Sequence, residues 1–500
     1  KHLANGPDVG PDVSLVLGGQ AGTEEARTVA KIAATSGVRK LIIGEDGLLS
    51  APAASNLVRK RNTAGAILLT ASHSDGIRFN HANGAPVGEA TKNKTYETAN
   101  TLAYREMAEI SDVDLSLVGI KRYGQLEVEI IDTTVDYVEF MKEIFDFDLI
   151  RKFLRNHPDF NVLFDAMHGI TGPYGIQIFQ TELGLPPSST MNCTPRSFGG
   201  GHPYSADLVE AVDKNGIHFG AASGSDGGQY MIYGQHTFVN PCDSVAIIAH
   251  HANFIPYFRK KGLHGLARSM PTSSSIDLVA KVQELEIYEV PTGWEFFCDL
   301  FDNEKILICG DESFSAGSNH IREKDGLWAI LAWLNIIAGV AQQKAHETPS
   351  IASIQNEFWK TYGRTFFTRY DYEHVDSDDA NKVIANLSAL VSNKDSFVGS
   401  SAWGLKVTDV GNFAYTNLDG SVSKNQGLYV RFGDGSRIVV RLSGTGSSGA
   451  TIRLYIEKHE DDEKKFSQTA DEYLKKNVGV ALSLLKMKEY IGREKPDVKT

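Results

Sequence analysis

The chain has 500 residues, of which 42% are hydrophobic and 22% charged, a composition typical of a globular protein with several domains. Its 50 basic and 62 acidic residues give a net charge of −12 at pH 7, which argues against a general affinity for nucleic acid or anionic membranes. The four cysteines are scattered and form no Cys-x-x-Cys pair. We therefore expect reduced thiols in a cytoplasmic protein, and neither a zinc site nor a redox centre.

The first part of the chain predicts alternating strands and helices. Residues 13–19 (VSLVLGG), 40–46 (KLIIGED) and 64–72 (AGAILLTAS) contain short apolar runs typical of buried strands. Thr23 is placed to cap a helix with acidic residues in its first turn. Strand, helix and strand in this order favour parallel α/β layers, and we expect this unit to end near residue 147.

The middle and the end of the chain continue this alternation. Residues 161–169 (NVLFDAMHG) and 217–222 (IHFGAA) predict strands, and residues 175–184 between them predict a helix. Residues 327–340 are apolar and predict a buried helix, since the sequence contains no run of the roughly 18 apolar residues that span a bilayer. Residues 469–491 have helical periodicity.

The most specific local pattern is RLSGTGSSGATIR, from Arg441 to Arg453, in which a loop of small residues at 443–449 separates two predicted strands. Glycine lets the main chain approach a ligand closely, and successive N–H groups form a concave anion site. Arginine grips phosphate in a bidentate fork. The pattern indicates a phosphate clamp, and a Gly/Ser hairpin turn flanked by surface arginines is the alternative.

This string resembles the phosphate-binding loop of the eukaryotic phosphoglucomutases in the α-D-phosphohexomutase superfamily, and the resemblance covers nearly the whole chain. The parafusin and aciculin branches share this architecture without always sharing the activity. Five further segments look like landmarks of the family: DAMHG (165–169), ARSMPTS (267–273), PTGW (291–294), SNHIREKDGLWAILAWL (318–334) and FFTRYDYE (366–373).

The resemblance implies an α/β fold with four domains, in which three related α/β domains and a C-terminal α+β domain surround a central cleft. We expect the domains at residues 1–147, 148–262, 263–363 and 364–500. They would carry, in this order, a phosphoserine loop, a metal loop, a sugar loop and the phosphate-binding loop. Ligand sites at the carboxyl ends of strands are usual in such sheets.

In similar mutases a phosphorylated serine gives its phosphoryl group to a hydroxyl of the sugar phosphate and regains one from the resulting bisphosphate. Ser72 matches this serine. His73 matches a position near the reacting hydroxyl, where imidazole can exchange a proton near neutral pH. Arg78 replaces a usual lysine, and a longer family insertion after His73 is absent.

The metal loop departs further from the family, which has Asp-Gly-Asp-Gly-Asp-Arg at this point. Gly224, Asp226 and Gly228 take the three ligand positions, and Gln229 takes the arginine position. Three carboxylates and a phosphoserine oxygen form an oxygen-rich set that suits Mg²⁺. Only Ser72 and Asp226 remain as metal ligands, so we expect Mg²⁺ binding to be weak or absent. A flexible surface turn is the alternative interpretation of this loop.

The resemblance also assigns the substrate contacts. Lys324 matches a lysine that approaches the sugar phosphate, and we count it with Ser72 and His73 as catalytic. Glu295 replaces another lysine and would repel a dianion unless it points away from the ligand. The remaining contacts are Arg78, Thr292, Gly293, Asp311 and Ser313, and in the clamp Arg441, Ser443, Gly444, Thr445, Ser447 and Arg453.

Two functions follow from these residues. Losing one preorganised electrostatic donor can lower a rate by about 10²–10³, so the metal loop favours a protein that binds phosphosugar but has lost or impaired phosphoryl transfer. Such a protein would have a regulatory or scaffolding role with an unidentified protein partner. The alternative is an active Mg²⁺-dependent phosphoglucomutase that interconverts glucose 1-phosphate and glucose 6-phosphate, with glucose 1,6-bisphosphate as activator. A phosphosugar sensor is a third hypothesis.

Overall fold

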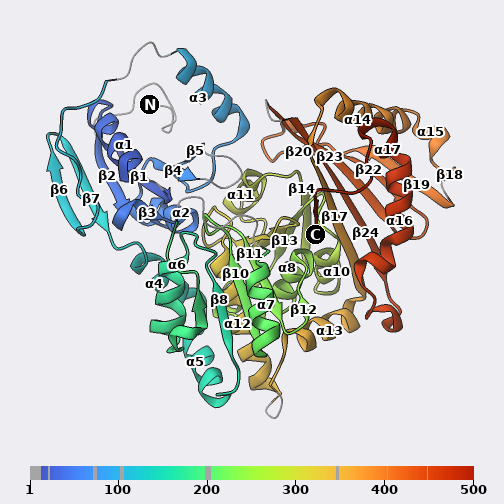
Figure 1. Ribbon diagram of the computed structural model, residues 1–500, viewed down its shortest axis with the longest axis horizontal. Helices are drawn as coiled ribbons and strands as arrows, with labels where there is room; N and C mark the ends of the chain where they lie inside the picture. The colour runs from blue at the N-terminus through green and yellow to red at the C-terminus, as the bar shows by residue number, and fades with distance from the viewer. Residues whose placement is uncertain are drawn as a thin grey trace. The chain divides into compact units, whose positions relative to one another are not determined.

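Figure 1 shows the computed structural model of the chain, coloured from the N-terminus to the C-terminus. The structure describes residues 13–20, 23–70, 76–101, 106–196, 204–344, 348–402, 404–446 and 449–500. The chain divides into two compact units. Unit 1 comprises Lys1–Ala267 and Phe297–Ile354, and unit 2 comprises Arg268–Phe296 and Gln355–Thr500. The chain passes between them within β13 (Gly265–Ser269), α11 (Trp294–Asp302) and α13 (Ile351–Tyr362).

Unit 1 begins with a sheet of order β5-β4-β1-β2-β7-β6, with β3 beside β1. The predicted strands β1 (Val13–Gln20), β2 (Val38–Gly44) and β4 (Gly65–Thr70) are parallel neighbours, which confirms the α/β layering. Their apolar side chains share a core with α1 (Thr23–Thr35). The region also contains β3 (Leu48–Leu49), α2 (Ala51–Arg61), β5 (Gly76–Asn80), α3 (Glu89–Thr101), β6 (Gly119–Tyr123), β7 (Leu126–Ile131), α4 (Val135–Ile144) and α5 (Phe147–Asn156).

The second sheet of unit 1 has the order β12-β11-β10-β8-β9. The predicted strands β8 (Val162–Asp165) and β10 (Phe219–Ser223) run parallel, and β11 (Tyr230–Gly234) returns antiparallel to β10. The predicted helix at 175–184 is a π-helix over Ile176–Glu182, because its bonds span one residue more than those of an α-helix. The region also contains α6 (Gly172–Gly175), β9 (Thr190–Met191), α7 (Ala206–Asn215) and β12 (Thr237–Phe238).

A long apolar helix, α12 (Gly326–Gln343), lies in the interior of unit 1. Within the described ranges it is the one helix with the length and composition of a membrane span, and it is buried from Gly326 to Val340, as predicted for residues 327–340. The Asp325 carboxylate caps it by accepting a hydrogen bond from Trp328 N (3.0 Å). Trp333 Nε1 donates to Ser244 Oγ (2.9 Å). It packs against α8 (Pro241–His250) and β16 (Ser315–Ser318), and the Trp328 ring contacts Phe258 of α9 (Pro256–Lys261). Strand β15 (Ile308–Asp311) pairs with β16.

Unit 2 contains an antiparallel sheet of order β18-β19-β22-β23-β24-β17-β25. Its long strands are β17 (Arg364–Val375), β23 (Arg437–Gly446) and β24 (Gly449–Glu460). The helices α14 (Ser377–Ser392) and α16 (Ala470–Leu484) cover the sheet and share one apolar core with it (Figure 1). The unit also contains α10 (Ser275–Val282), β14 (Glu286–Val290), α15 (Lys394–Phe397), β18 (Ser401–Ala402), β19 (Leu405–Asn412), β20 (Tyr415–Thr416), β21 (Val422–Ser423), β22 (Leu428–Phe432), α17 (Met487–Ile491) and β25 (Val498–Lys499).

The predicted fold class is confirmed. Parallel α/β layers precede an antiparallel sheet covered by helices in the C-terminal part of the chain. The helical periodicity at 469–491 corresponds to α16 and α17. The four domain boundaries stay predictions.

Candidate active site

Several of the predicted site residues meet in unit 1, where they are carried by three hairpins. Arg78 lies on β5, Asp226 lies in the turn between β10 and β11, and Ser313 lies in the turn between β15 and β16. The predicted catalytic residues Ser72 and His73 lie outside the described residues. They belong to the connection between β4 and β5, which run antiparallel.

Arg78 links two of these segments through ion pairs. Its Nη1 lies 3.3 Å from Oδ2 of Asp226, and its Nη2 lies 2.5 Å from Oε1 of Glu323. The Glu323 side chain is 1% exposed and also accepts a hydrogen bond from Asn80 Nδ2 (3.1 Å). Because a buried carboxylate must be paired or hydrogen-bonded, Glu323 holds the Arg78 guanidinium beside Asp226.

The turn that carries Asp226 is bonded to other segments of unit 1, so the alternative of a flexible surface turn is wrong. Ala51 N donates to Asp226 O (3.1 Å), and Gly326 N donates to Gly227 O (2.9 Å). These bonds attach the turn to the first residues of α2 and α12. The backbone position of the Asp226 carboxylate is therefore fixed by the fold.

The side chains present do not fit the three-carboxylate magnesium site that the resemblance implies. Gly224 and Gly228 supply no ligand at two of the three positions. Asp226 Oδ1 accepts a hydrogen bond from Gly228 N (3.0 Å), and Oδ2 faces Arg78. In the part of the chain that the structure describes, no three His, Cys, Asp or Glu side chains gather as metal ligands. The cation that contacts Asp226 is the Arg78 guanidinium.

Gln229 joins the metal loop to the sugar loop. Its Nε2 donates to the backbone carbonyl of Ser313 (2.6 Å), and Gln229 and Ser315 form an isolated antiparallel bridge. The residue is buried, where an unpaired carbonyl would be unfavourable. Gln229 therefore serves as a hydrogen-bond donor between two loops and supplies no positive charge.

The sugar loop is a tight turn closed by Asp311. Its Oδ1 accepts hydrogen bonds from both N and Oγ of Ser313 (2.8 Å each). Burial raises the pKa of the Asp311 carboxyl above its usual value; the Lys324 ammonium opposes this shift, and the Glu312 carboxylate adds to it. Lys324 Cδ lies 3.3 Å from the position that a Cβ on Gly228 would take. Lys324 thus lies close to both the metal loop and the sugar loop.

Unit 2 carries the predicted clamp. Arg441 on β23 and Arg453 on β24 are direct partners across the strand pair. Arg441 Nε donates to Gln426 O (3.3 Å), and Arg453 Nε lies 3.7 Å from Asp371 Oδ2. Residues directly opposite in an antiparallel pair project to the same face, so two guanidinium groups concentrate positive charge there.

The small-residue loop predicted at 443–449 is shorter in the structure. Strand β23 continues to Gly446 and β24 begins at Gly449, because these two glycines still pair across a register shift. Ser443, Gly444 and Thr445 therefore belong to a strand. Ser447 and the Thr445 side chain lie outside the described residues.

The segment after β14 holds the two other predicted substrate contacts of unit 2. Thr292 Oγ1 is buried and has no hydrogen-bond partner among the described residues, which is unusual for a buried hydroxyl. Gly293 has a φ of 142°. Oε2 of Glu295 lies 2.8 Å from the position that a Cβ on Gly293 would take. The Glu295 carboxylate therefore lies directly against one of the predicted contacts.

Comparison with known proteins identifies the family. The family model "Phosphoglucomutase/phosphomannomutase, alpha/beta/alpha" matches residues 19–106 as domain I and residues 241–362 as domain III. The model "Phosphoglucomutase-1, C-terminal domain" matches residues 364–497. A phosphoglucomutase of Aspergillus oryzae is 66% identical over 99% of this chain and 92% of its own length. The chain belongs to the phosphoglucomutase family.

Two further phosphoglucomutase relatives support this assignment. The phosphoglucomutase of Schizosaccharomyces pombe is 50% identical over 97% of this chain and 91% of its own length. Among solved structures, the open form of the exocytosis-sensitive phosphoprotein pp63/parafusin (phosphoglucomutase) from Paramecium aligns with a TM-score of 0.87 at 37% identity. That alignment covers 100% of this chain and 91% of the other. A parafusin-like branch is not confirmed, since the fungal phosphoglucomutases are more similar.

The expectation that this family member has lost phosphoryl transfer and is not an enzyme is wrong. Six relatives that carry the name phosphoglucomutase are 49–66% identical to it over 97–99% of its length. The sequence argument counted the charges missing from one loop, although the electrostatics of a site depends on every group that faces it. Arg78 is such a group, and it lies on β5, outside the metal loop.

Sequence reasoning missed several buried charged residues of this phosphoglucomutase family member. Glu323 lies in the irregular connection between β16 and α12, where no periodicity separates buried from exposed positions. Arg437 and Glu457 are buried charges on β23 and β24. The available signal was a charged residue within an otherwise apolar strand, as in RIVVRL.

Proposed function

We propose that this chain is an active phosphoglucomutase that interconverts glucose 1-phosphate and glucose 6-phosphate. The observation that carries the proposal is 64–66% identity over 99% of the chain to phosphoglucomutases of Aspergillus oryzae, Aspergillus fumigatus and Emericella nidulans. We favour the fungal branch over a parafusin-like one, because identity to the Aspergillus oryzae phosphoglucomutase is 66% and identity to Paramecium parafusin is 37%. A cytoplasmic location is part of the proposal.

Ser72 would carry the transferred phosphoryl group. The bond between Ser72 Oγ and phosphorus breaks as an oxygen of the sugar hydroxyl bonds to the same phosphorus, and His73 accepts the hydroxyl proton. The departing Ser72 Oγ takes up a proton and becomes a hydroxyl. The bisphosphate then returns its other phosphoryl group to Ser72, whose hydroxyl proton is given up as the new bond to phosphorus forms, and the oxygen released on the sugar takes up a proton. Free glucose 1,6-bisphosphate would activate the resting enzyme by phosphorylating Ser72.

The remaining predicted residues would bind the sugar phosphate. Arg441 and Arg453 would hold the phosphate that is not transferred, because their paired guanidinium groups suit a dianion. Lys324 would add a charge near the sugar, and the Thr292 hydroxyl would bond to the ligand. The other proposed contacts are Arg78, Gly293, Asp311, Ser313, Ser443, Gly444, Thr445 and Ser447.

We propose that the reaction depends only weakly on Mg²⁺. In the family the ion neutralises charge that develops during phosphoryl transfer. In this chain a phosphorylated Ser72 and Asp226 are what remains of the family's ligand set, which is a poor set for a hard cation. Arg78 keeps a fixed positive charge at Asp226, and a guanidinium can bind phosphoryl oxygens through two N–H groups.

A coupled assay of glucose 6-phosphate formation tests the function. With glucose 1-phosphate and catalytic glucose 1,6-bisphosphate, the wild-type protein should turn over, and Ser72→Ala should lower kcat/KM by at least about 10³-fold. Ser74→Ala, in the same connection, is the matched control and should retain activity. Absence of wild-type turnover at saturating substrate, or full activity of Ser72→Ala, would contradict the proposal.

A further inference from the structure

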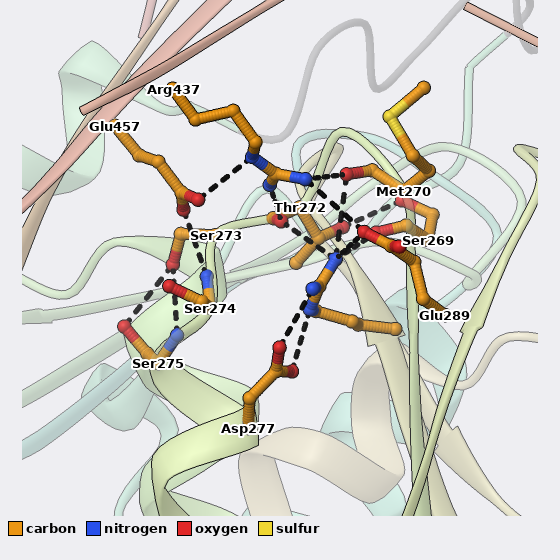
Figure 2. Close-up of polar contacts among 11 residues, drawn as sticks. Ser269, Met270, Thr272, Ser273, Ser274, Ser275, Asp277, Glu289, Arg437 and Glu457 are labelled. Atoms are coloured by element: carbon orange, nitrogen blue, oxygen red, sulfur yellow. Dashed lines mark hydrogen bonds and ion pairs between the residues drawn. The ribbon is translucent and has the colours of Figure 1, made fainter. Parts of the chain in front are cut away.

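Unit 2 contains a network of buried and half-buried charges that the proposed chemistry does not use. It joins Arg437 on β23 and Glu457 on β24 to the segment Arg268–Phe296 (Figure 2). We call it the Arg437 network, and it comprises Arg268, Asp277, Glu289, Arg437 and Glu457. Both arginine side chains are at most 5% exposed.

The Arg437 side chain binds main-chain carbonyls of the connection between β13 and α10. Its Nη1 donates to Met270 O and its Nη2 donates to Thr272 O, both at 2.9 Å. Its Nε lies 2.8 Å from Glu457 Oε1. Figure 2 shows the guanidinium pointing at these carbonyls while Glu457 lies between Arg437 and Ser274. Two carbonyls held by one planar fork fix both the position and the orientation of the connection.

Glu457 completes this attachment from the neighbouring strand. Its Oε2 accepts a hydrogen bond from Ser274 N (2.9 Å), at the start of α10. Its other oxygen faces Arg437, so the carboxylate is satisfied at both ends. The adjacent strands β23 and β24 therefore contribute one charge each to the same connection.

The network extends to the residues before Thr292 and Gly293. Arg268 forms a bidentate pair with Asp277 (2.7 Å for both bonds) and bonds to Glu289 Oε1 (2.9 Å). Glu289 also lies 3.2 Å from Arg437 Nη1. Burial alone would raise the pKa of Glu289, but the guanidinium charges of Arg268 and Arg437 hold that pKa below its usual value. Met270 N donates to Val290 O (2.8 Å), two residues before Thr292.

The same connection also contacts the clamp. Met270 Cε lies 2.5 Å from the position that a Cβ on Gly427 would take, and Arg441 Cγ lies 3.1 Å from that position. The Met270 side chain and the Arg441 stem therefore meet over Gly427, where any side chain would clash. Arg437 lies on the same strand as Arg441, β23, and precedes it in the sequence.

We propose that Arg437 and Glu457 are positioning residues that set the spacing between the phosphate clamp and the Thr292–Gly293 contacts. The proposal rests on the proposed function, because it concerns one sugar phosphate bound at both places. A hexose phosphate has a rigid ring, so the protein must contact its phosphate and its distant hydroxyls at the same time. Misplacement of one set of contacts by about 1 Å can lower a rate about 10²-fold. Loss of the network should therefore impair binding of the whole sugar phosphate more than binding of its phosphate alone.

The test compares two ligands on the full chain by calorimetric titration in the absence of glucose 1,6-bisphosphate, so that Ser72 carries no phosphoryl group and the ligands are not turned over. Arg437→Met should weaken glucose 6-phosphate binding at least about tenfold, while inorganic phosphate, which needs the clamp alone, should change less than about twofold. Glu457→Gln should act in the same direction. Lys458→Met is the matched control, since Lys458 is the next residue on β24 and pairs with Asp434 (3.0 Å) outside the network.

Unchanged binding of both ligands in Arg437→Met would overturn the proposal, and so would an equal loss of both, which would indicate general damage to the clamp. Where Arg437→Met does not fold, Arg437→Lys takes its place under the same criteria, because lysine keeps the charge but cannot bond to both carbonyls as a fork. Failure of the proposed mutase activity would be separate from these outcomes, since both ligands are titrated without a reaction.

Discussion

Arg78 contacts two carboxylates that differ in solvent exposure. The more buried of the two determines the orientation of the Arg78 guanidinium. Glu323 is 1% exposed, whereas Asp226 is 13% exposed. An ionised carboxylate as buried as Glu323 requires a partner, so Glu323 determines where the guanidinium lies. Asp226 then receives a fixed positive charge as a consequence of that packing.

Replacement of Arg78 by methionine tests this dependence. Arg78→Met should lower the free energy of unfolding by about 1–3 kcal/mol, because among the described residues Glu323 would keep only the Asn80 hydrogen bond. Urea titration measures the difference. Arg122→Met is the control, since Arg122 is 77% exposed and its pair with Glu127 should contribute less than about 1 kcal/mol. Equal stability of Arg78→Met and wild type would show that Glu323 does not depend on Arg78.

Asp311 should make the stability of the chain depend on pH. Burial raises the pKa of its carboxyl in the folded state, so the folded state binds the proton more tightly than the unfolded state. The contribution of Asp311 to stability is therefore greatest below the unfolded pKa of about 4 and is lost as the pH rises through the raised value. Relative to wild type, Asp311→Asn should therefore become more stable as the pH rises from about 4 to 7. The measurement is the free energy of unfolding of both proteins at each pH.

Asp434 provides a control of opposite sign. Although burial opposes the shift, hydrogen bonds from Ser436, Lys458 and Asn477 lower the pKa of Asp434 to about 2. Its contribution to stability is present above about pH 4 and is lost as the pH falls toward 2. Asp434→Asn should therefore be less stable than wild type at pH 7, with a difference that shrinks in acid. Parallel pH trends for the two variants would contradict the assigned cause of both shifts.

At the scale of elements, the turn between β10 and β11 is held by backbone hydrogen bonds that do not depend on metal ligands. Its backbone bonds to Ala51 and Gly326 do not involve the side chains at 224 and 228. A Cβ added at Gly224 would lie 3.2 Å from Gln229 Cβ. A Cβ added at Gly228 would lie 3.3 Å from Asp226 Oδ1. Both positions therefore admit a side chain after a small adjustment.

Restoring both carboxylates tests the proposed weak metal dependence. Gly224→Asp with Gly228→Asp should tighten binding of Mn²⁺ alone at least about tenfold, because affinity for hard cations increases with ligand charge. A spectroscopic titration of free Mn²⁺ measures it without turnover. Gly88→Asp is the control, at a glycine with no atoms near its Cβ position. Wild-type binding as tight as that of the double variant would show that Asp226 and its neighbours already form a metal site.

The sequence predicted elements where local pattern decides and failed where tertiary contacts decide. The strands β1, β2 and β4 and the buried helix α12 follow from apolar runs. The extension of β23 to Gly446 could not be predicted, since it depends on pairing with Gly449 on the next strand. Small residues in a loop and in a paired strand look alike in sequence.

For the candidate site, motifs identified which loops to examine but not what holds them. Arg78 and Glu323 are 245 residues apart in sequence, and Arg437 and Met270 are 167 apart. No local spacing predicts contacts at such distances. The expectation drawn from the metal loop, that phosphoryl transfer is lost, was wrong, because relatives 50–66% identical over nearly the whole chain are phosphoglucomutases.

At the scale of the whole molecule, neither unit contains all the predicted residues. Unit 1 contains Asp226, Asp311 and Lys324, and unit 2 contains the clamp and Thr292. Similarity to phosphoglucomutases extends over 99% of the chain and through both units. The proposed activity is therefore a property of the full chain, and every test above uses it.

Transfer of a labelled phosphoryl group through Ser72 is the most direct test of the proposed function. The full chain is incubated with labelled glucose 1,6-bisphosphate and freed of ligand. Intact mass and peptide mapping then locate the label, before and after glucose 6-phosphate is added. We expect one phosphoryl group on Ser72 that passes to the added sugar phosphate. A folded protein that binds the bisphosphate but never acquires a phosphoryl group on Ser72 would contradict the proposal.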